Sequence, residues 1–130
     1  MPAMTPFPIA EDQQRFILRS LASVPHLEAV LLLREGRERR WSGAQVAQRL
    51  YLSEKAALQL LADLCASGML RQDADGLYAY APQGAELVRM LDRVADTYSR
   101  NLIGVSTLIH SKSKKQAQVF ADAFIWRKEP

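Results

Sequence analysis

The sequence contains a single cysteine, two histidines and no long apolar run. One cysteine, Cys65, excludes an internal disulfide and a cysteine-based zinc site, and it fits the reducing cytoplasm, where we expect the protein to be located. The longest aliphatic run, residues 29–33, is far too short to span a bilayer, so we expect no membrane partner. The first residues have neither the basic start nor the apolar core of a secretory signal. With only six glycines and six prolines, the composition also argues against a collagen-like chain.

What is present is close to the average of a soluble globular domain: 130 residues, of which 48% are apolar and 24% charged. The net charge is only +3, and its position is more informative than its size. Residues 1–25 and residues 26–81 each carry equal numbers of basic and acidic side chains, so residues 82–130 supply the whole excess. Composition alone names no function.

Apolar residues at helical spacing predict several helices in the first half of the chain. A first helix is expected over residues 9–24, and a second one begins after Pro25, which suits the first turn of a helix. Ser42 and Gln45 have the spacing of a capping box, which predicts a helix over residues 42–50. A further helix is expected over residues 53–67, because Ser53 is a good N-cap and Gly68 a good residue to follow the last turn.

After Gly68 the apolar period changes from helical to two, and the sequence around Asp75-Gly76 predicts a β-hairpin over residues 70–80. From Gln83 to about His110, apolar residues at steps of three and four predict one long amphipathic helix. A last short helix is expected over residues 119–126. The stripe of the long helix consists of Leu87, Leu91, Val94, Tyr98, Leu102, Val105 and Ile109.

Three helices followed by a hairpin, with short links, are the plan of the winged helix-turn-helix. The stretch from Ser42 to Tyr80, above all LSEKAALQLLADLCASGML over residues 52–70, resembles the winged-helix transcription regulators of bacteria, most nearly those of the MarR type. The resemblance covers about 55 residues and consists of capping and periodicity, so it is specific for fold and weak for function. It implies a mainly α chain with an N-terminal arm and helix (1–25), a winged helix-turn-helix domain (26–81) and a long helical C-terminal extension (82–130).

The resemblance also implies that the helix over residues 53–67 is a recognition helix, which reads the DNA major groove with outward side chains near its start. We expect Lys55 to contact phosphate or guanine and Gln59 to bond adenine, while Ser53 and Arg71 contact the DNA backbone. The candidate DNA-binding residues, with three peripheral arginines last, are Ser53, Lys55, Gln59, Arg71, Arg37, Arg39 and Arg40.

Several departures from the family oppose DNA binding. Members usually carry a basic residue where Gln59 stands and often another where Asp63 stands, and their wing tip is commonly basic, whereas this one contains Asp73 and Asp75. Carboxylates near a phosphate backbone weaken an interaction that draws most of its affinity from neutralising phosphates. The three peripheral arginines alternate with glutamates, which favours a solvated loop of mixed charge.

The alternative function is a winged helix that binds another protein without DNA, with Leu58, Ala62 and Ala66 as its docking face. The sequence shows no catalytic site. His26, His110 and Cys65 have no metal-ligand spacing, and no nucleophile motif or phosphate-binding loop is present. We therefore predict a non-enzymatic protein without cofactor or metal, and a buried structural role for Cys65.

The apolar stripe and the aromatic C-terminal residues predict a homodimer, because a monomer would leave them exposed. The other interpretation is intramolecular: the helix over residues 9–24 covers the stripe within one chain. The candidate dimer residues are Leu91, Tyr98, Leu102, Val105, Phe120, Phe124 and Trp126. The leading prediction is therefore a cytoplasmic regulator of transcription that binds double-stranded DNA as a dimer.

Overall fold

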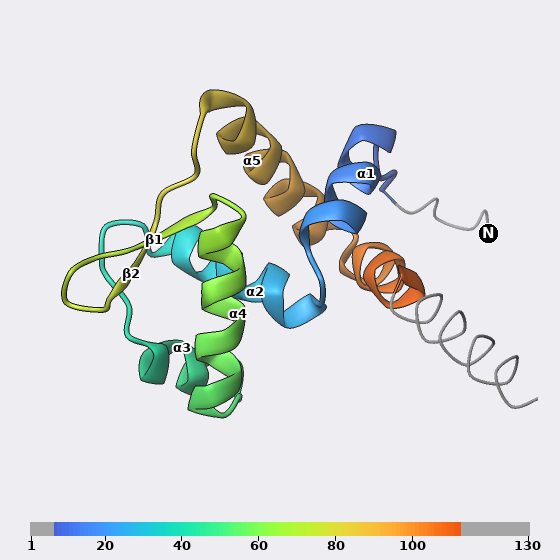
Figure 1. Ribbon diagram of the computed structural model, residues 1–130. Helices are drawn as coiled ribbons and strands as arrows, with labels where there is room; N and C mark the ends of the chain where they lie inside the picture. The colour runs from blue at the N-terminus through green and yellow to red at the C-terminus, as the bar shows by residue number, and fades with distance from the viewer. Residues whose placement is uncertain (1–6, 113–130) are drawn as a thin grey trace, which may run out of the picture.

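The computed structural model describes residues 7–112, which form a mainly helical body with one β-hairpin between the fourth and fifth helices (Figure 1). Residues 102–112 are helical as well. The predicted fold class is thereby confirmed: three helices and a wing-like hairpin, with one helix before them and helical residues after them. The elements are α1 (Glu11–Ser20), α2 (Val24–Glu35), α3 (Gly43–Leu50), α4 (Glu54–Ala66), β1 (Leu70–Gln72), β2 (Tyr78–Tyr80) and α5 (Ala85–Arg100).

The ends of α3 and α4 follow from the capping residues that the sequence displays. The Ser42 hydroxyl accepts a hydrogen bond from the Gln45 N–H at 3.1 Å, and the Gln45 side chain accepts one from the Ser42 N–H at 2.9 Å. Ser53 caps α4 by accepting from the Ala56 N–H at 3.1 Å. Gly68, at a φ of +77°, lies just beyond the end of α4, where a left-handed residue closes the last turn.

The hairpin pairs with a third segment that the sequence analysis did not assign. β1 and β2 are antiparallel, with Arg71 opposite Ala79. Tyr78 in β2 also pairs with Trp41, which precedes α3: the Trp41 N–H donates to the Tyr78 carbonyl at 2.8 Å, and the Tyr78 N–H donates back at 2.7 Å. The loop between α2 and α3 is therefore tied to the wing.

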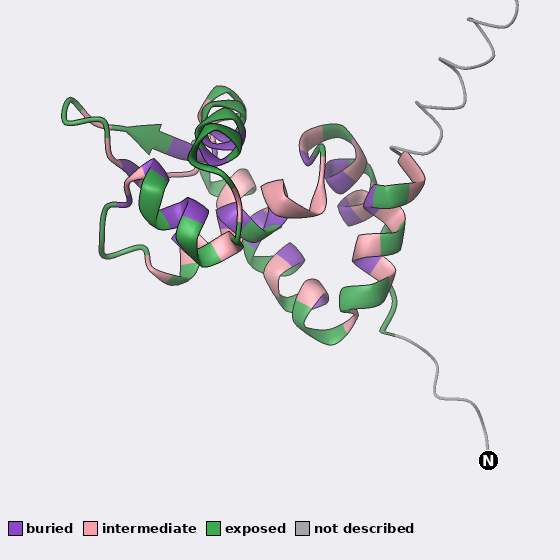
Figure 2. Cartoon of the chain, turned by 90° about the horizontal axis from the view of Figure 1, so that it is seen from below, coloured by how far each residue is buried: buried purple, intermediate pink, exposed green. Residues whose placement is uncertain are grey.

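The core lies where one face each of α2, α3 and α4 meets the hairpin and Trp41. The opposite face of α4 is exposed, as Figure 2 shows for the helix seen nearly end-on, green outside and purple toward its neighbours. Burial of these apolar side chains is the main source of stability for such a small domain. Fully or almost fully buried here are Leu27, Val30, Leu33, Trp41, Val46, Ala57, Leu61, Leu64, Met69 and Tyr78.

The predicted single helix from Gln83 to about His110 is wrong, because the chain breaks at Asn101. α5 ends at Arg100, Asn101 has a φ of −147° and a ψ of 63°, and a new helical segment follows. The Asn101 side chain accepts from the Gly104 N–H at 2.9 Å and donates to the Phe7 carbonyl at 2.8 Å. It thus caps the second segment and fixes the bend.

α1 packs beside α5 within the same chain (Figure 1). Its Phe16 and Ile17 are buried, and its Asp12 accepts two hydrogen bonds from Arg93 of α5, one of them 2.9 Å long. The intramolecular interpretation of the apolar stripe therefore accounts for part of it. No single helix in residues 7–112 is long and apolar enough to cross a membrane. α1 and α2 taken together have the length and composition for it, but they are bent by 104° relative to each other.

Candidate nucleic-acid interface

The outward face of α4 presents the side chains predicted for a recognition helix. Lys55 and Gln59 are exposed, and with Glu54, Leu58 and Ala62 they line a shallow groove along this face. Ser53 is exposed at the N-cap, where its hydroxyl is engaged with the helix. The structure therefore brings the three central candidates together at the start of one exposed helix face.

Asp63 of α4 is turned toward the start of α2, where it contacts His26. The His26 Nε2 lies 2.8 Å from the Asp63 carboxylate, and the His26 Nδ1 lies 2.6 Å from the Ser23 hydroxyl. Ser, His and Asp thus lie in a row, but the serine hydroxyl also accepts from the His26 N–H as the N-cap of α2. The row links α2 to α4, and it gives Asp63 a partner within the protein.

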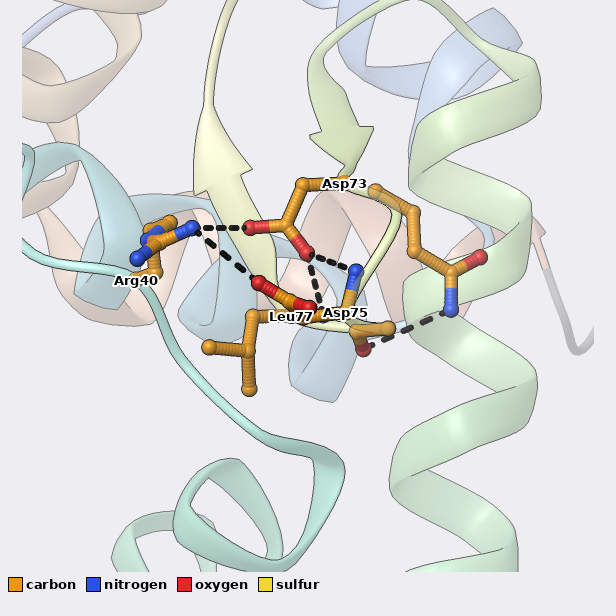
Figure 3. A network of polar contacts seen from close by, with 6 residues as sticks. Arg40, Asp73, Asp75 and Leu77 are labelled. Carbon is orange, nitrogen blue, oxygen red and sulfur yellow. Dashed lines mark hydrogen bonds and ion pairs between the residues drawn. The ribbon is translucent and has the colours of Figure 1, made fainter.

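The acidic wing tip is organised around one carboxylate, as Figure 3 shows. Asp73 Oδ1 accepts from the N–H groups of Asp75 and Leu77, at 2.9 and 3.0 Å. Its other oxygen lies 2.8 Å from the Arg40 guanidinium, which also lies 3.8 Å from Asp75. The hydrogen bond from Leu77, helped by Arg40, holds the pKa of Asp73 below its usual value.

This arrangement changes the expected electrostatics of the wing. Arg40, predicted as a peripheral DNA contact, points at the wing carboxylates and offsets part of their charge. Arg71, the one basic residue on β1, is exposed and forms no ion pair within residues 7–112. Arg37 is exposed and lines a cavity between α2 and α5.

The sequence analysis missed two residues of this region. Arg49, in the last turn of α3, lies with Arg39 around the Trp41 ring: their guanidinium carbons are 5.4 and 3.8 Å from its centroid. Tyr51 forms the turn between α3 and α4 in the left-handed region, at a φ of 57°, and its side chain is 95% exposed. The signal for Tyr51 was present, because it stands between two capped helices two residues before Ser53.

The candidate dimer residues divide into three groups. Leu91 and Val105 are fully buried within the single chain, whereas Tyr98 is half-buried and Leu102 is 54% exposed. Tyr98 and Leu102 line, with apolar residues of α2, an open cavity of about 640 Å³. Next to Leu102, Ile103 is 77% exposed. The predicted helix over residues 119–126 and its Phe120, Phe124 and Trp126 lie outside the described residues.

Residues 7–112 contain no group of three potential metal ligands. Cys65 is half-buried on α4, and burial raises the pKa of its thiol, which disfavours the reactive thiolate. His110 is exposed near the end of the described chain.

Comparison with protein-family models, curated proteins and solved structures found no match to this chain. The description therefore rests on the fold itself: a small, mainly helical protein with a β-hairpin between α4 and α5, compatible with a winged helix.

Proposed function

We propose that this chain is a non-enzymatic regulator of transcription, of the MarR-like winged-helix type, which binds double-stranded DNA in the cytoplasm as a homodimer. The observation that carries the proposal is the exposed face of α4, where Lys55 and Gln59 stand free at the start of a helix that is otherwise anchored in the core. A capped helix with one buried and one polar, exposed side is what a major-groove reader requires.

In this proposal each candidate side chain has a defined task. The Gln59 amide has the donor and acceptor needed for paired hydrogen bonds with adenine, and Lys55 neutralises a phosphate or bonds guanine. Arg71 on β1 contacts the backbone beside the groove. The wing acids weaken binding less than their number indicates, because Arg40 and the turn backbone already engage Asp73.

The dimer in this proposal is built on the far side of the molecule from the wing. Leu102 and Ile103 form an exposed apolar patch where the chain bends after α5. Two copies joined there would carry two α4 helices, so that one operator with two half-sites is read by one assembly.

The proposal is tested by fluorescence anisotropy of a labelled random-sequence duplex, titrated with the full chain at several salt concentrations. We expect binding whose log affinity falls linearly with log salt by a slope worth several phosphates. Lys55→Ala and Arg71→Ala should each lower the slope by about 1 on every sequence, whereas Gln59→Ala should mainly relax base preference once an operator is selected. Arg15→Ala on α1 is the matched control, and absence of binding at low salt would overturn the proposal.

A second candidate function, docking of another protein on α4, is favoured by one observation. Leu58 is 41% exposed in the middle of the groove that Lys55 and Gln59 also line, and Tyr51 stands exposed at the preceding turn. For protein docking, Leu58→Asp abolishes the complex while Lys55→Ala changes it little. For DNA binding the order of the two effects is reversed.

A further inference from the structure

Trp41 provides a fixed aromatic platform at the junction of the α2–α3 loop and the wing. Its backbone is held by two hydrogen bonds to Tyr78, and its indole N–H donates to the Gly36 carbonyl at 3.3 Å. The residue is only 2% exposed, so its ring is covered on all sides. Part of that cover consists of the guanidinium groups of Arg39 and Arg49.

These two guanidiniums lie around one indole, and neither has a carboxylate partner in residues 7–112. Their distances of 3.8 and 5.4 Å to one ring centroid place both groups around the same indole. Neither forms an ion pair with a carboxylate of residues 7–112, whereas four other arginines of the same region do. Two like charges gathered on one platform repel each other, and an anion that bridges them relieves the repulsion. The four paired arginines are Arg34, Arg40, Arg93 and Arg100.

The local structure places each of the two arginines beside the Trp41 indole. Arg39 lies at a bend two residues before Trp41, where its N–H donates to the Gly36 carbonyl at 3.2 Å, and its guanidinium stacks over the indole. Arg40, one residue on, pairs with the wing acids instead. Arg49 reaches the ring from the last turn of α3, and stacking on an aromatic face limits the conformations of each side chain.

We propose that Arg39 and Arg49 form a two-arginine clamp over Trp41 that binds a backbone phosphate of duplex DNA. The planar guanidinium is the side chain best suited to paired hydrogen bonds with phosphate oxygens. The clamp joins the α2–α3 loop, which runs beside the hairpin in Figure 1, to the end of α3, which lies beside α4. It deepens the proposed function and rests on it, because it supplies the positive anchor that the acidic wing tip lacks.

The clamp is tested with the full chain and a labelled random duplex, by measuring the salt dependence of the dissociation constant. The variants are Arg39→Gln, Arg49→Gln and the double substitution, with Arg39→Lys/Arg49→Lys to keep the charge and Arg15→Gln as an exposed arginine elsewhere. Circular dichroism confirms that each variant is folded. We expect the double Gln variant to lose between 1 and 2 in the log–log salt slope and on the order of tenfold or more in affinity at moderate salt. The Lys pair should keep most of the slope.

The outcomes separate the clamp from the function on which it rests. If the original chain does not bind DNA at low salt, the proposed function fails and the clamp fails with it. If that chain binds and the folded double Gln variant keeps its slope, or loses no more than Arg15→Gln does, the clamp alone is overturned. Should the double variant unfold, Arg49→Gln decides by itself, because its guanidinium is the more distant from the ring. An unchanged slope in that single variant would reject the clamp.

Discussion

At the scale of single residues, Asp73 shows how an acidic side chain at the tip of the wing can be required by the fold. Its carboxylate accepts hydrogen bonds from two backbone N–H groups of the hairpin turn and one from the Arg40 guanidinium. Because the folded state lowers the pKa of Asp73, the ionised form stabilises the fold above the unfolded value near 3.8, and this contribution disappears as the pH falls through the folded pKa.

We therefore predict that Asp73→Asn lowers the free energy of unfolding at pH 7, and that the gap to the original chain closes as the pH falls below about 4. Urea unfolding followed by circular dichroism between pH 7 and pH 3 measures both. Asp75→Asn is the control, since Asp75 accepts no hydrogen bond from the turn and lies farther from Arg40. A gap that is the same at all pH values would show that the charge of Asp73 does not matter.

Tyr51, in contrast, lowers the stability of the fold. Its backbone is strained in the left-handed region, and its side chain is almost entirely in solvent, where little burial compensates for the strain. A left-handed conformation costs an L-residue with a Cβ roughly 1–2 kcal/mol, a cost that glycine avoids. Tyr51→Gly should therefore raise the free energy of unfolding by about 0.5–1 kcal/mol, after glycine's greater chain entropy is subtracted. Chemical denaturation of Tyr51→Gly and Tyr51→Ala tests this, because only the glycine variant relieves the strain. Equal stability of the two variants would contradict it.

At the scale of elements, the break at Asn101 allows two helical segments to bury apolar residues of one continuous sequence stripe. Leu91 and Val94 are buried from α5, and Val105 and Ile109 from the segment after the bend. Asn101→Ala removes the N-cap of that segment and the hydrogen bond to Phe7, and should cost about 1 kcal/mol or more. Asn101→Asp keeps the capping oxygen and should recover most of the loss in thermal unfolding. If Asn101→Ala left the stability unchanged, the bend would not depend on this side chain.

The elements that the sequence predicted well are those with local signals. The capping box at Ser42, the N-cap at Ser53 and the glycine after α4 each lie within a few residues of the boundary they set. The break at Asn101 was missed because the apolar spacing continues across it without a change of period. An asparagine ahead of a possible helix was the available signal.

The candidate site was predictable only in part, for a related reason. The outward face of α4 follows from helical periodicity, so the exposure of Lys55 and Gln59 was predicted correctly. The pairing of Arg40 with Asp73 joins residues 33 positions apart, and no local pattern indicates a contact of that kind. The same holds for the contact between His26 and Asp63.

At the scale of the whole molecule, the proposed dimer makes a prediction about mass. Leu102 and Ile103 are exposed apolar residues at the start of the helical segment after Asn101, and a charge placed there should disfavour association. Light scattering of the full chain at tens of micromolar should give twice the chain mass of 14.6 kDa, and Ile103→Asp should shift the result toward 14.6 kDa. Leu58→Asp, on the face assigned to DNA, should leave the mass unchanged. A single-chain mass for the unaltered protein would reject the dimer.

The pairing of Trp41 with Tyr78 also determines where the chain can be truncated without loss of the fold. A fragment that begins at residue 42 contains all of α3, α4 and the hairpin, and these elements alone have the length of a small domain. It nevertheless leaves the outer edge of β2 without its partner and removes a large buried side chain from the core. An unpaired strand edge invites pairing with another chain, so such a fragment should aggregate. The self-contained unit of this fold therefore starts upstream of Trp41, with α2 included.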